Sequence, residues 1–212
     1  MTTDARAEVR ESAERPRFSA LVSGGTGFVG SALVERLDRV AVFSRDPDRA
    51  QRSLRRRLGR DVPCFAWRPE EGPPEAKSLE GIDVVYHLAG KSIDTRWSAT
   101  VKEELVASRV NSTRQLIEAL ADTERRPRAL ICASAIGYYG DRGDQRLDES
   151  AAPGEGFLAD LCVAWEREAL RASELGMRVH TLRIGVVLGR DGGALKKMLP
   201  IFRWGLGGRL GR

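Results

Sequence analysis

Three glycines at a fixed spacing mark the segment of the chain best suited to chemistry. Gly24, Gly27 and Gly30 form a G-x-x-G-x-x-G pattern between the apolar run 18–23 and the helix-like run 31–37. Glycine permits a tight turn with positive φ, and it leaves backbone amides open to a diphosphate. The start of the following helix adds unpaired N–H groups and a partial positive charge. The pattern therefore predicts a dinucleotide-binding loop, with a plain turn as the alternative, made of Gly24, Gly25, Thr26, Gly27, Phe28, Val29 and Gly30.

The end of the second apolar run indicates which dinucleotide this loop would bind. At such a position a carboxylate accepts hydrogen bonds from a ribose 2′-hydroxyl, whereas an arginine pairs with a 2′-phosphate. The chain reads Ser44-Arg45-Asp46 there. Ser44 and Arg45 together predict a clamp for the 2′-phosphate of NADP. Asp46 leaves NAD open as the alternative cofactor, although in Asp-Pro-Asp this residue equally suits the cap of the next helix.

The elements that must position these residues follow a regular order. Short apolar runs alternate with helical patterns, which is typical of βαβ units and a parallel sheet. Strands are expected at 18–23, 40–44, 62–66, 83–89, 129–134 and 179–184, and helices at 28–38, 47–58, 101–121 and 157–175. Thr100 is the expected N-cap of the third helix, and 68–78 is an expected loop. We therefore predict an α/β fold of the Rossmann type with a doubly wound parallel sheet.

Composition limits the class of protein further. The chain has 212 residues, of which 42% are hydrophobic and 31% charged, with a formal net charge of +5. These values are ordinary for one globular domain, which we place at 18–212 after a disordered polar tail at 1–17. The tail lacks the apolar segment of a signal peptide, and no run reaches the roughly 20 apolar residues needed to cross a bilayer. A cytoplasmic protein with no membrane partner is expected.

Neither a metal site nor a nucleic-acid partner is predicted. The three cysteines are far apart, form no CxxC and have apolar neighbours, as buried free thiols do. His87 and His180 fit no metal-ligand spacing and are expected within strands. The arginines of 49–57 suit the solvated face of a helix. A nucleic-acid patch is the weaker alternative because no aromatic residues are interleaved with them.

With these residues in place, the chain resembles the extended short-chain dehydrogenase/reductases, the NAD(P)-dependent epimerase/dehydratase family. SGGTGFVG at 23–30, YHLAG at 86–90 and Asn111-Ser-Thr113 are similar to motifs of that family. The segments 97–113, 134–141, 157–166, 182–202 and 205–208 resemble an atypical subfamily of uncharacterised epimerase-like proteins, often named after a cell-division inhibitor. The resemblance runs from about residue 18 to the end of the chain.

This resemblance adds expected cofactor contacts to those of the glycine loop, Ser44 and Arg45. It implies contacts from Leu88 and Ala89, from Glu104 and Arg109 on the long helix, and from Val187 after the sixth strand. Gly90 is expected beside them because Leu88-Ala89-Gly90 ends a strand at the carboxyl edge of the sheet, where such ligands bind. Without the family, Arg109 would be interpreted as a surface arginine that could also neutralise a phosphate.

The resemblance also reveals a departure at the catalytic positions. Ordinary members use a Tyr-x-x-x-Lys pair in which the lysine lowers the pKa of the tyrosine, together with a serine or threonine that orients the substrate oxygen. Ser134 matches the serine, but the positions of the pair hold Leu158 and Cys162. Tyr138 is a candidate replacement acid or base, as is its neighbour Tyr139, with packing or ligand stacking as the alternative.

The chain also ends earlier than the family resemblance implies. Relatives continue beyond the position of Arg212 into a substrate-binding region, so we expect a fragment or a shortened form. The predicted function is an NADP-binding epimerase- or oxidoreductase-like protein with an unknown small-molecule substrate. The alternative is a non-enzymatic NADP-dependent sensor or scaffold. The candidate assembly is a homodimer.

Overall fold

A parallel sheet of six strands forms the centre of the molecule in the computed structural model, which describes residues 18–189 and 192–208. The spatial order is β3-β2-β1-β4-β5-β6, and each pair of neighbours is parallel. The strands are β1 Ser19–Ser23, β2 Arg39–Ser44, β3 Cys64–Ala66, β4 Val84–His87, β5 Ala129–Ala135 and β6 Arg178–Ile184. The predicted fold class is confirmed, and the strand order reverses between β1 and β4, where such sheets bind ligands.

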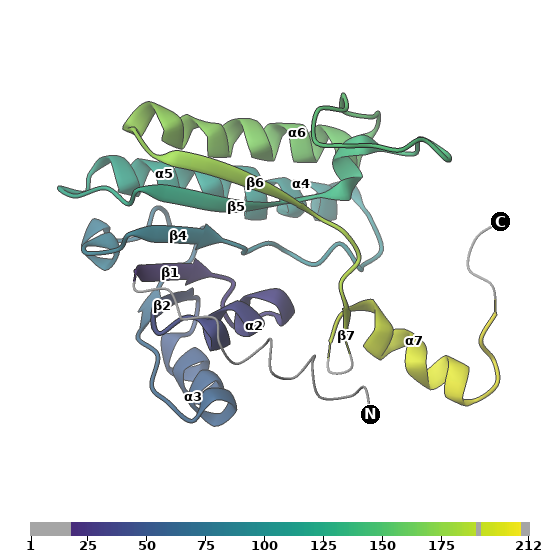
Figure 1. Cartoon of the computed structure of the whole chain (residues 1–212), viewed down its shortest axis with the longest axis horizontal. Helices are drawn as coiled ribbons and strands as arrows, with labels where there is room; N and C mark the ends of the chain where they lie inside the picture. The colour runs from purple at the N-terminus through teal and green to yellow at the C-terminus, as the bar shows by residue number, and fades with distance from the viewer. Residues whose placement is uncertain (1–17, 190–191, 209–212) are drawn as a thin grey trace, which may run out of the picture.

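Helices cover both faces of this sheet (Figure 1). The α-helices are α2 Phe28–Arg36, α3 Pro47–Leu58, α4 Ala99–Val106, α5 Ser112–Ala121, α6 Phe157–Leu170 and α7 Gly193–Arg203. Short 3₁₀ turns occupy η1 Ala76–Leu79, η3 Ile136–Tyr139 and η4 Arg171–Leu175, and η2 Ala107–Asn111 is a π turn. A short strand, β7 Leu188–Gly189, precedes α7, and both lie beyond the carboxyl ends of the sheet strands.

Alternating side chains of β1 divide the core between the two faces. Ala20 and Val22 pack with Val34 of α2 and Leu54 of α3. Leu21 points the other way, into a cluster that includes side chains of α5 and α6. Each fully buried aliphatic side chain of this kind contributes about 1.5–3 kcal/mol. This burial on both faces explains the nearly continuous apolar runs of the central strands.

The helix predicted at 101–121 is longer and less regular than its pattern suggests. It begins at Ala99, and the N-cap is Ser98, whose Oγ accepts a hydrogen bond from Val101 N at 3.2 Å, so the expectation of a Thr100 cap is wrong. The π turn η2 interrupts the middle of this helix. Neither β7 nor α7 is among the elements expected from the sequence. The predicted tail at 1–17 lies outside the described residues.

The cysteines and histidines lie where the sequence places them, with differences in exposure. Cys132 and Cys162 are buried, Cys64 is half-buried, and all three are free thiols. His87 is fully buried in β4, whereas His180 is exposed on β6. Within residues 18–189 and 192–208, no group of His, Cys, Asp and Glu side chains could hold a metal ion. No helix in that part of the chain is long and apolar enough to cross a membrane.

Candidate functional site

The glycine loop forms a cradle at the carboxyl end of β1. Gly24 has φ +72°, and a Cβ there would lie 2.9 Å from the backbone of Leu88 and Ala89. A Cβ on Gly30 would lie 2.2 Å from the carbonyl oxygen of Gly24, so α2 packs against the loop as only glycine allows. Gly27, the N-cap of α2, offers no side-chain cap, and the first turn has no acidic residue. The amides of this turn are therefore suited to an anion.

The remaining members of the predicted loop lie at the start of α2. Thr26 is exposed, and Phe28 and Val29 expose 36% and 38% of their surfaces. Gly25 is buried against β2, where a Cβ would lie 2.7 Å from the Val42 side chain. The loop thus presents Thr26, Gly27, Phe28 and Val29 outward, while Gly25 and Gly30 pack inward.

Ser23, directly before the loop, joins β1 to the end of β4. Its Oγ accepts hydrogen bonds from Leu88 N at 3.1 Å and Ala89 N at 3.2 Å, and lies 2.7 Å from His87 Nδ1. Since the oxygen already accepts two N–H groups, its own hydrogen points at Nδ1. Burial lowers the pKa of His87 to about 4, so the ring is neutral and its Nε2–H faces Ser112 Oγ at 3.3 Å. These buried hydrogen bonds fix the glycine loop relative to Leu88 and Ala89.

The adenosine end of the predicted site lies at the end of β2. The Ser44 hydroxyl donates to the Asp46 carbonyl at 3.0 Å and accepts from Asp46 N at 3.1 Å. The Asp46 carboxylate accepts a hydrogen bond from Arg49 N at 2.9 Å and caps α3. This supports the cap interpretation of Asp46. Arg45 is exposed at the same edge of the sheet as the glycine loop.

Residues after β4 form the next part of the edge. The Lys91 ammonium lies in the exposed segment after β4 and pairs with the half-exposed Glu104 carboxylate of α4. Arg109 donates to the Lys91 carbonyl at 2.8 Å. A Cβ at Gly90 would lie 3.2 Å from Arg109 Cζ. Arg109 thus lies beside Gly90, and both Glu104 and Arg109 contact Lys91, while their roles as cofactor contacts stay predictions.

Val187 lies in the segment that follows β6, and its role as a cofactor contact stays a prediction. A Cβ on Gly193 would lie 2.3 Å from the Val187 carbonyl oxygen and 2.9 Å from the Phe28 ring. Cβ atoms on Gly189 and Gly192 would lie 2.4 Å and 2.3 Å from the same ring. The segment around β7 therefore packs on Phe28 at the start of α2. The glycines of the sequence GRDGG (189–193) allow that contact, and they are the signal in the sequence from which it could have been expected.

The two catalytic candidates lie in a buried ionic cluster. Ser134 is 3% exposed, and its hydroxyl donates to Glu166 Oε1 at 2.6 Å. Arg183 donates from Nε and Nη2 to the two oxygens of Glu166, both at 2.9 Å, and this carboxylate raises the pKa of Arg183. Arg183 Cζ also lies 3.5 Å from the centre of the Tyr138 ring, and Arg183 Nη1 donates a hydrogen bond to Tyr139 Oη at 2.9 Å. The catalytic roles of Ser134 and Tyr138 stay predictions.

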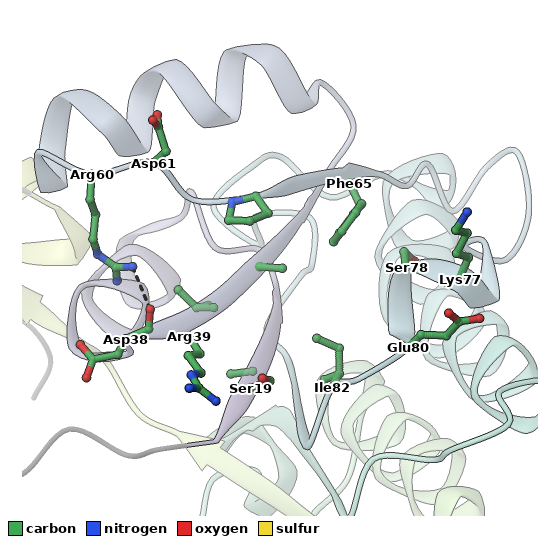
Figure 2. A pocket seen from close by; sticks show the side chains of 14 residues that line it. Ser19, Asp38, Arg39, Arg60, Asp61, Phe65, Lys77, Ser78, Glu80 and Ile82 are labelled. Atoms are coloured by element: carbon green, nitrogen blue, oxygen red, sulfur yellow. Dashed lines mark hydrogen bonds between the residues drawn. The ribbon is translucent and has the colours of Figure 1, made fainter.

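A separate hollow lies at the opposite edge of the sheet (Figure 2). It is lined by the amino ends of β1 and β2, including Ser19 and Arg39. Arg60 at its rim donates to the Val34 carbonyl at 3.0 Å and the Asp38 carbonyl at 3.2 Å, which satisfies the end of α2. The Arg60 guanidinium therefore stabilises the fold. The hollow lies at the amino ends of the strands, away from the glycine loop.

Known proteins resemble the chain over most of its length. The model of the NAD dependent epimerase/dehydratase family matches residues 20–203. The chloroplastic epimerase family protein SDR39U1 homologue of Arabidopsis thaliana is 37% identical over 207 residues, which cover 94% of this chain and 58% of that protein. An epimerase family protein of Mycobacterium bovis is 40% identical over 191 residues, or 90% of this chain and 60% of that protein.

A solved structure shows the same arrangement of elements. The crystal structure of human epimerase family protein SDR39U1 (isoform 2) with NADPH has a TM-score of 0.74 and 32% identity, and covers 91% of this chain and 62% of that one. The chain thus spans 58% to 62% of the length of these three relatives. None of these three relatives has a name derived from cell division, so that part of the resemblance stays a prediction.

Proposed function

Because the chain belongs to the NAD dependent epimerase/dehydratase family, we propose that it binds NADP across the carboxyl edge of its sheet. The observation that carries this proposal is the cradle formed by the glycine loop, where a Cβ on Gly24 or Gly30 would collide with backbone atoms. The uncapped first turn of α2 would hold the pyrophosphate through its amides. When bound, the nicotinamide would supply hydride acceptance or donation.

The choice of NADP over NAD rests on the end of β2. Arg45 is exposed there and free to pair with a 2′-phosphate, while Asp46 is engaged in capping α3. The human relative that contains NADPH is consistent with this choice. Ser44 would have to turn its hydroxyl from Asp46 to join the clamp. NAD is the alternative cofactor, and Leu88, Ala89, Gly90, Glu104, Arg109 and Val187 complete the proposed cofactor site.

The activity that we propose is that of an epimerase- or oxidoreductase-like enzyme acting on a small molecule of unknown identity. Ser134 is the candidate for orienting a substrate oxygen, and Tyr138 is the candidate acid or base. Both side chains would have to change partners, because Glu166 holds the Ser134 hydroxyl and Arg183 covers the Tyr138 ring. The proposal names no substrate, because the chain spans only part of the length of its relatives.

The second candidate function is a non-enzymatic NADP-dependent sensor or scaffold. The family resemblance assigns the tyrosine and lysine positions of ordinary members to Leu158 and Cys162, both on α6. A hydrocarbon cannot transfer a proton, and burial raises the pKa of the Cys162 thiol. These two side chains favour binding without turnover.

Turnover of NADPH distinguishes the two candidates. The purified chain would be mixed with NADPH and a panel of carbonyl compounds and nucleotide sugars, and loss of NADPH absorbance would be followed. Oxidation that depends on a panel member supports the enzyme, and its loss in Tyr138→Phe would assign the acid or base. Tight NADPH binding with no oxidation by any panel member favours the sensor. Absence of NADPH binding overturns both.

A further inference from the structure

Two aromatic side chains meet where the segment after β4 reaches the start of α6. The ring centres of Trp97 and Phe157 lie 5.7 Å apart at an interplanar angle of 70°, which is an edge-to-face contact. Trp97 comes from the segment between β4 and α4, and Phe157 is the first residue of α6. Trp97 keeps 40% of its surface exposed, and Phe157 is half-buried. Rings from two different elements thus form one partly exposed aromatic surface.

Hydrogen bonds within a short turn hold Trp97 in this position. Its Nε1 donates to the Ile93 carbonyl at 2.9 Å, and Thr95 N donates to the same carbonyl at 2.9 Å. Ser98, directly after the tryptophan, caps α4. The indole N–H is therefore satisfied within its own segment. Because the ring is already fixed, it loses little conformational freedom when a ligand packs on it, which favours binding.

A cation lies beside the two rings. Lys102 Nζ lies 5.1 Å from the centre of the Phe157 ring, within the range of a cation–π contact. Lys102 is exposed on α4. Within residues 18–189 and 192–208, the ion pair of α4 is that of Glu104 with Lys91, and no carboxylate pairs with Lys102. Its ammonium is therefore available to an anionic group of a ligand that packs on the rings.

The fold places these three side chains at the carboxyl edge of the sheet, beside the catalytic candidates. β4 and β5 are parallel neighbours, so the segments that follow them lie at the same edge. Leu158, next to Phe157, packs on η3, where a Cβ on Gly137 would lie 3.5 Å from the Leu158 Cβ. η3 directly follows β5, which carries Ser134, whereas Arg45 follows β2 on the other side of β1. The three side chains therefore lie on the substrate side of the glycine loop rather than on its adenosine side.

Packing at the start of a helix explains only part of this arrangement. Trp97 and Lys102 stand one residue before and four residues after the N-cap Ser98, the positions whose side chains often pack together to fix the entry of the chain into a helix. Such packing needs the two side chains to cover each other. Yet the tryptophan keeps a large exposed surface, and the lysine is exposed as well. The exposed surface exceeds what the start of α4 requires.

We propose that Trp97, Phe157 and Lys102 form a substrate subsite for a planar conjugated ring that carries one carboxylate. The two aromatic side chains would pack on the ring of the ligand, and the ammonium would pair with its carboxylate. One lysine balances one negative charge, which favours a monocarboxylate over the two charges of a nucleotide diphosphate. This inference rests on the proposed NADP-dependent function and goes beyond it by naming the class of substrate.

Four probes separate the features of such a ligand. Phenylglyoxylate has a ring, a carbonyl and a carboxylate, acetophenone lacks the carboxylate, pyruvate lacks the ring, and UDP-glucose represents the nucleotide sugars. NMR titration would measure the affinity of each probe for the wild-type chain, Trp97→Leu, Lys102→Gln and Lys102→Arg, with and without NADPH. Phe65→Leu, at a 39% exposed aromatic residue of β3, is the matched control. Calorimetry would measure NADPH binding, and thermal unfolding reports the folding of each variant.

The wild-type chain should bind phenylglyoxylate at least about tenfold more tightly than acetophenone or pyruvate. Trp97→Leu and Lys102→Gln should each weaken that binding about tenfold, Lys102→Arg should restore most of it, and Phe65→Leu should not change it. NADPH affinity should stay the same in all variants. If Trp97→Leu does not fold, Lys102→Gln decides, because the lysine is exposed.

Three results would overturn the subsite: equal affinities for the first three probes, unchanged phenylglyoxylate binding in folded Lys102→Gln, or a preference for UDP-glucose. A wild-type chain that binds NADPH but not phenylglyoxylate refutes the subsite alone. A wild-type chain that does not bind NADPH refutes the proposed function instead.

Discussion

At the scale of single residues, the site depends on glycines, because a Cβ at their positions would collide with neighbouring atoms. Gly30→Ala would place a Cβ 2.2 Å from the Gly24 carbonyl oxygen, which is backbone and cannot turn aside. We expect a loss of about 1–3 kcal/mol of stability and of about tenfold or more in NADPH affinity. Chemical denaturation and calorimetry measure the two effects.

Gly59→Ala is the control for that substitution. Gly59 has φ +68° at the end of α3, and a Cβ there would meet no other atom within 4 Å. The alanine should cost about 1–2 kcal/mol through its backbone conformation and leave NADPH affinity unchanged. If Gly30→Ala binds NADPH as the wild type does, the cradle does not hold the pyrophosphate.

Arg45 is the residue expected to decide between the two cofactors. Replacing it with alanine removes a charge-assisted contact to a 2′-phosphate, so the affinity for NADPH should fall about 10- to 100-fold while that for NADH stays the same. Arg52→Ala, an exposed arginine on α3, serves as the control and should change neither affinity. A parallel loss of NADH binding in Arg45→Ala would show that Arg45 does not read the 2′-phosphate.

His87 makes stability depend on pH. Burial lowers its pKa from 6.5 to about 4, so between these values the unfolded chain binds a proton that the folded chain refuses. Unfolding free energy should therefore fall as the pH is lowered through this window, by up to about 3 kcal/mol from this group. Denaturation at several pH values, compared with His87→Gln, isolates the effect. Identical pH slopes in both proteins would contradict a neutral buried ring.

At the scale of elements, the two candidate caps of α4 can be compared directly. Ser98 Oγ accepts the hydrogen bond from Val101 N that caps α4, whereas Thr100 lies inside the first turn. Ser98→Ala should lower the free energy of unfolding by about 0.5–2 kcal/mol, and Thr100→Ala should change it by less than about 0.5 kcal/mol. Chemical denaturation measures both. If Thr100→Ala lowers the free energy of unfolding more than Ser98→Ala does, Thr100 is the cap, as the sequence pattern predicts.

Elements with strong patterns could be predicted from the sequence, and irregular ones could not. The apolar runs around Leu21 and Val42 lie in strands because both faces of a central strand are buried. The π turn at Ala107–Asn111 is a single irregular turn inside a continuous helix, and no residue type in it marks the irregularity, so the sequence does not reveal it. Helix α7 was missed because it begins among glycines and contains Pro200, both of which argue against a helix.

At the scale of the whole molecule, the contacts around the catalytic candidates that the sequence did not reveal join distant segments. Glu166 of α6 meets Arg183 of β6, and the pairing of Ser134 with Arg183 across β5 and β6 brings the cluster together. Charged residues are usually exposed to solvent, so the sequence gives no reason to pair Glu166 with Arg183. Only the register of β5 and β6 shows that the two meet. The glycine loop needed no such information because its residues are contiguous.

Every role proposed for the site depends on the binding of a phosphorylated dinucleotide at the loop that follows β1. Calorimetric titration of the wild-type chain with NADPH and NADH is the decisive experiment. We expect saturable one-to-one binding of NADPH, at least about tenfold tighter than that of NADH. If neither dinucleotide associates with the chain, even at millimolar concentration, the loop is not a dinucleotide site.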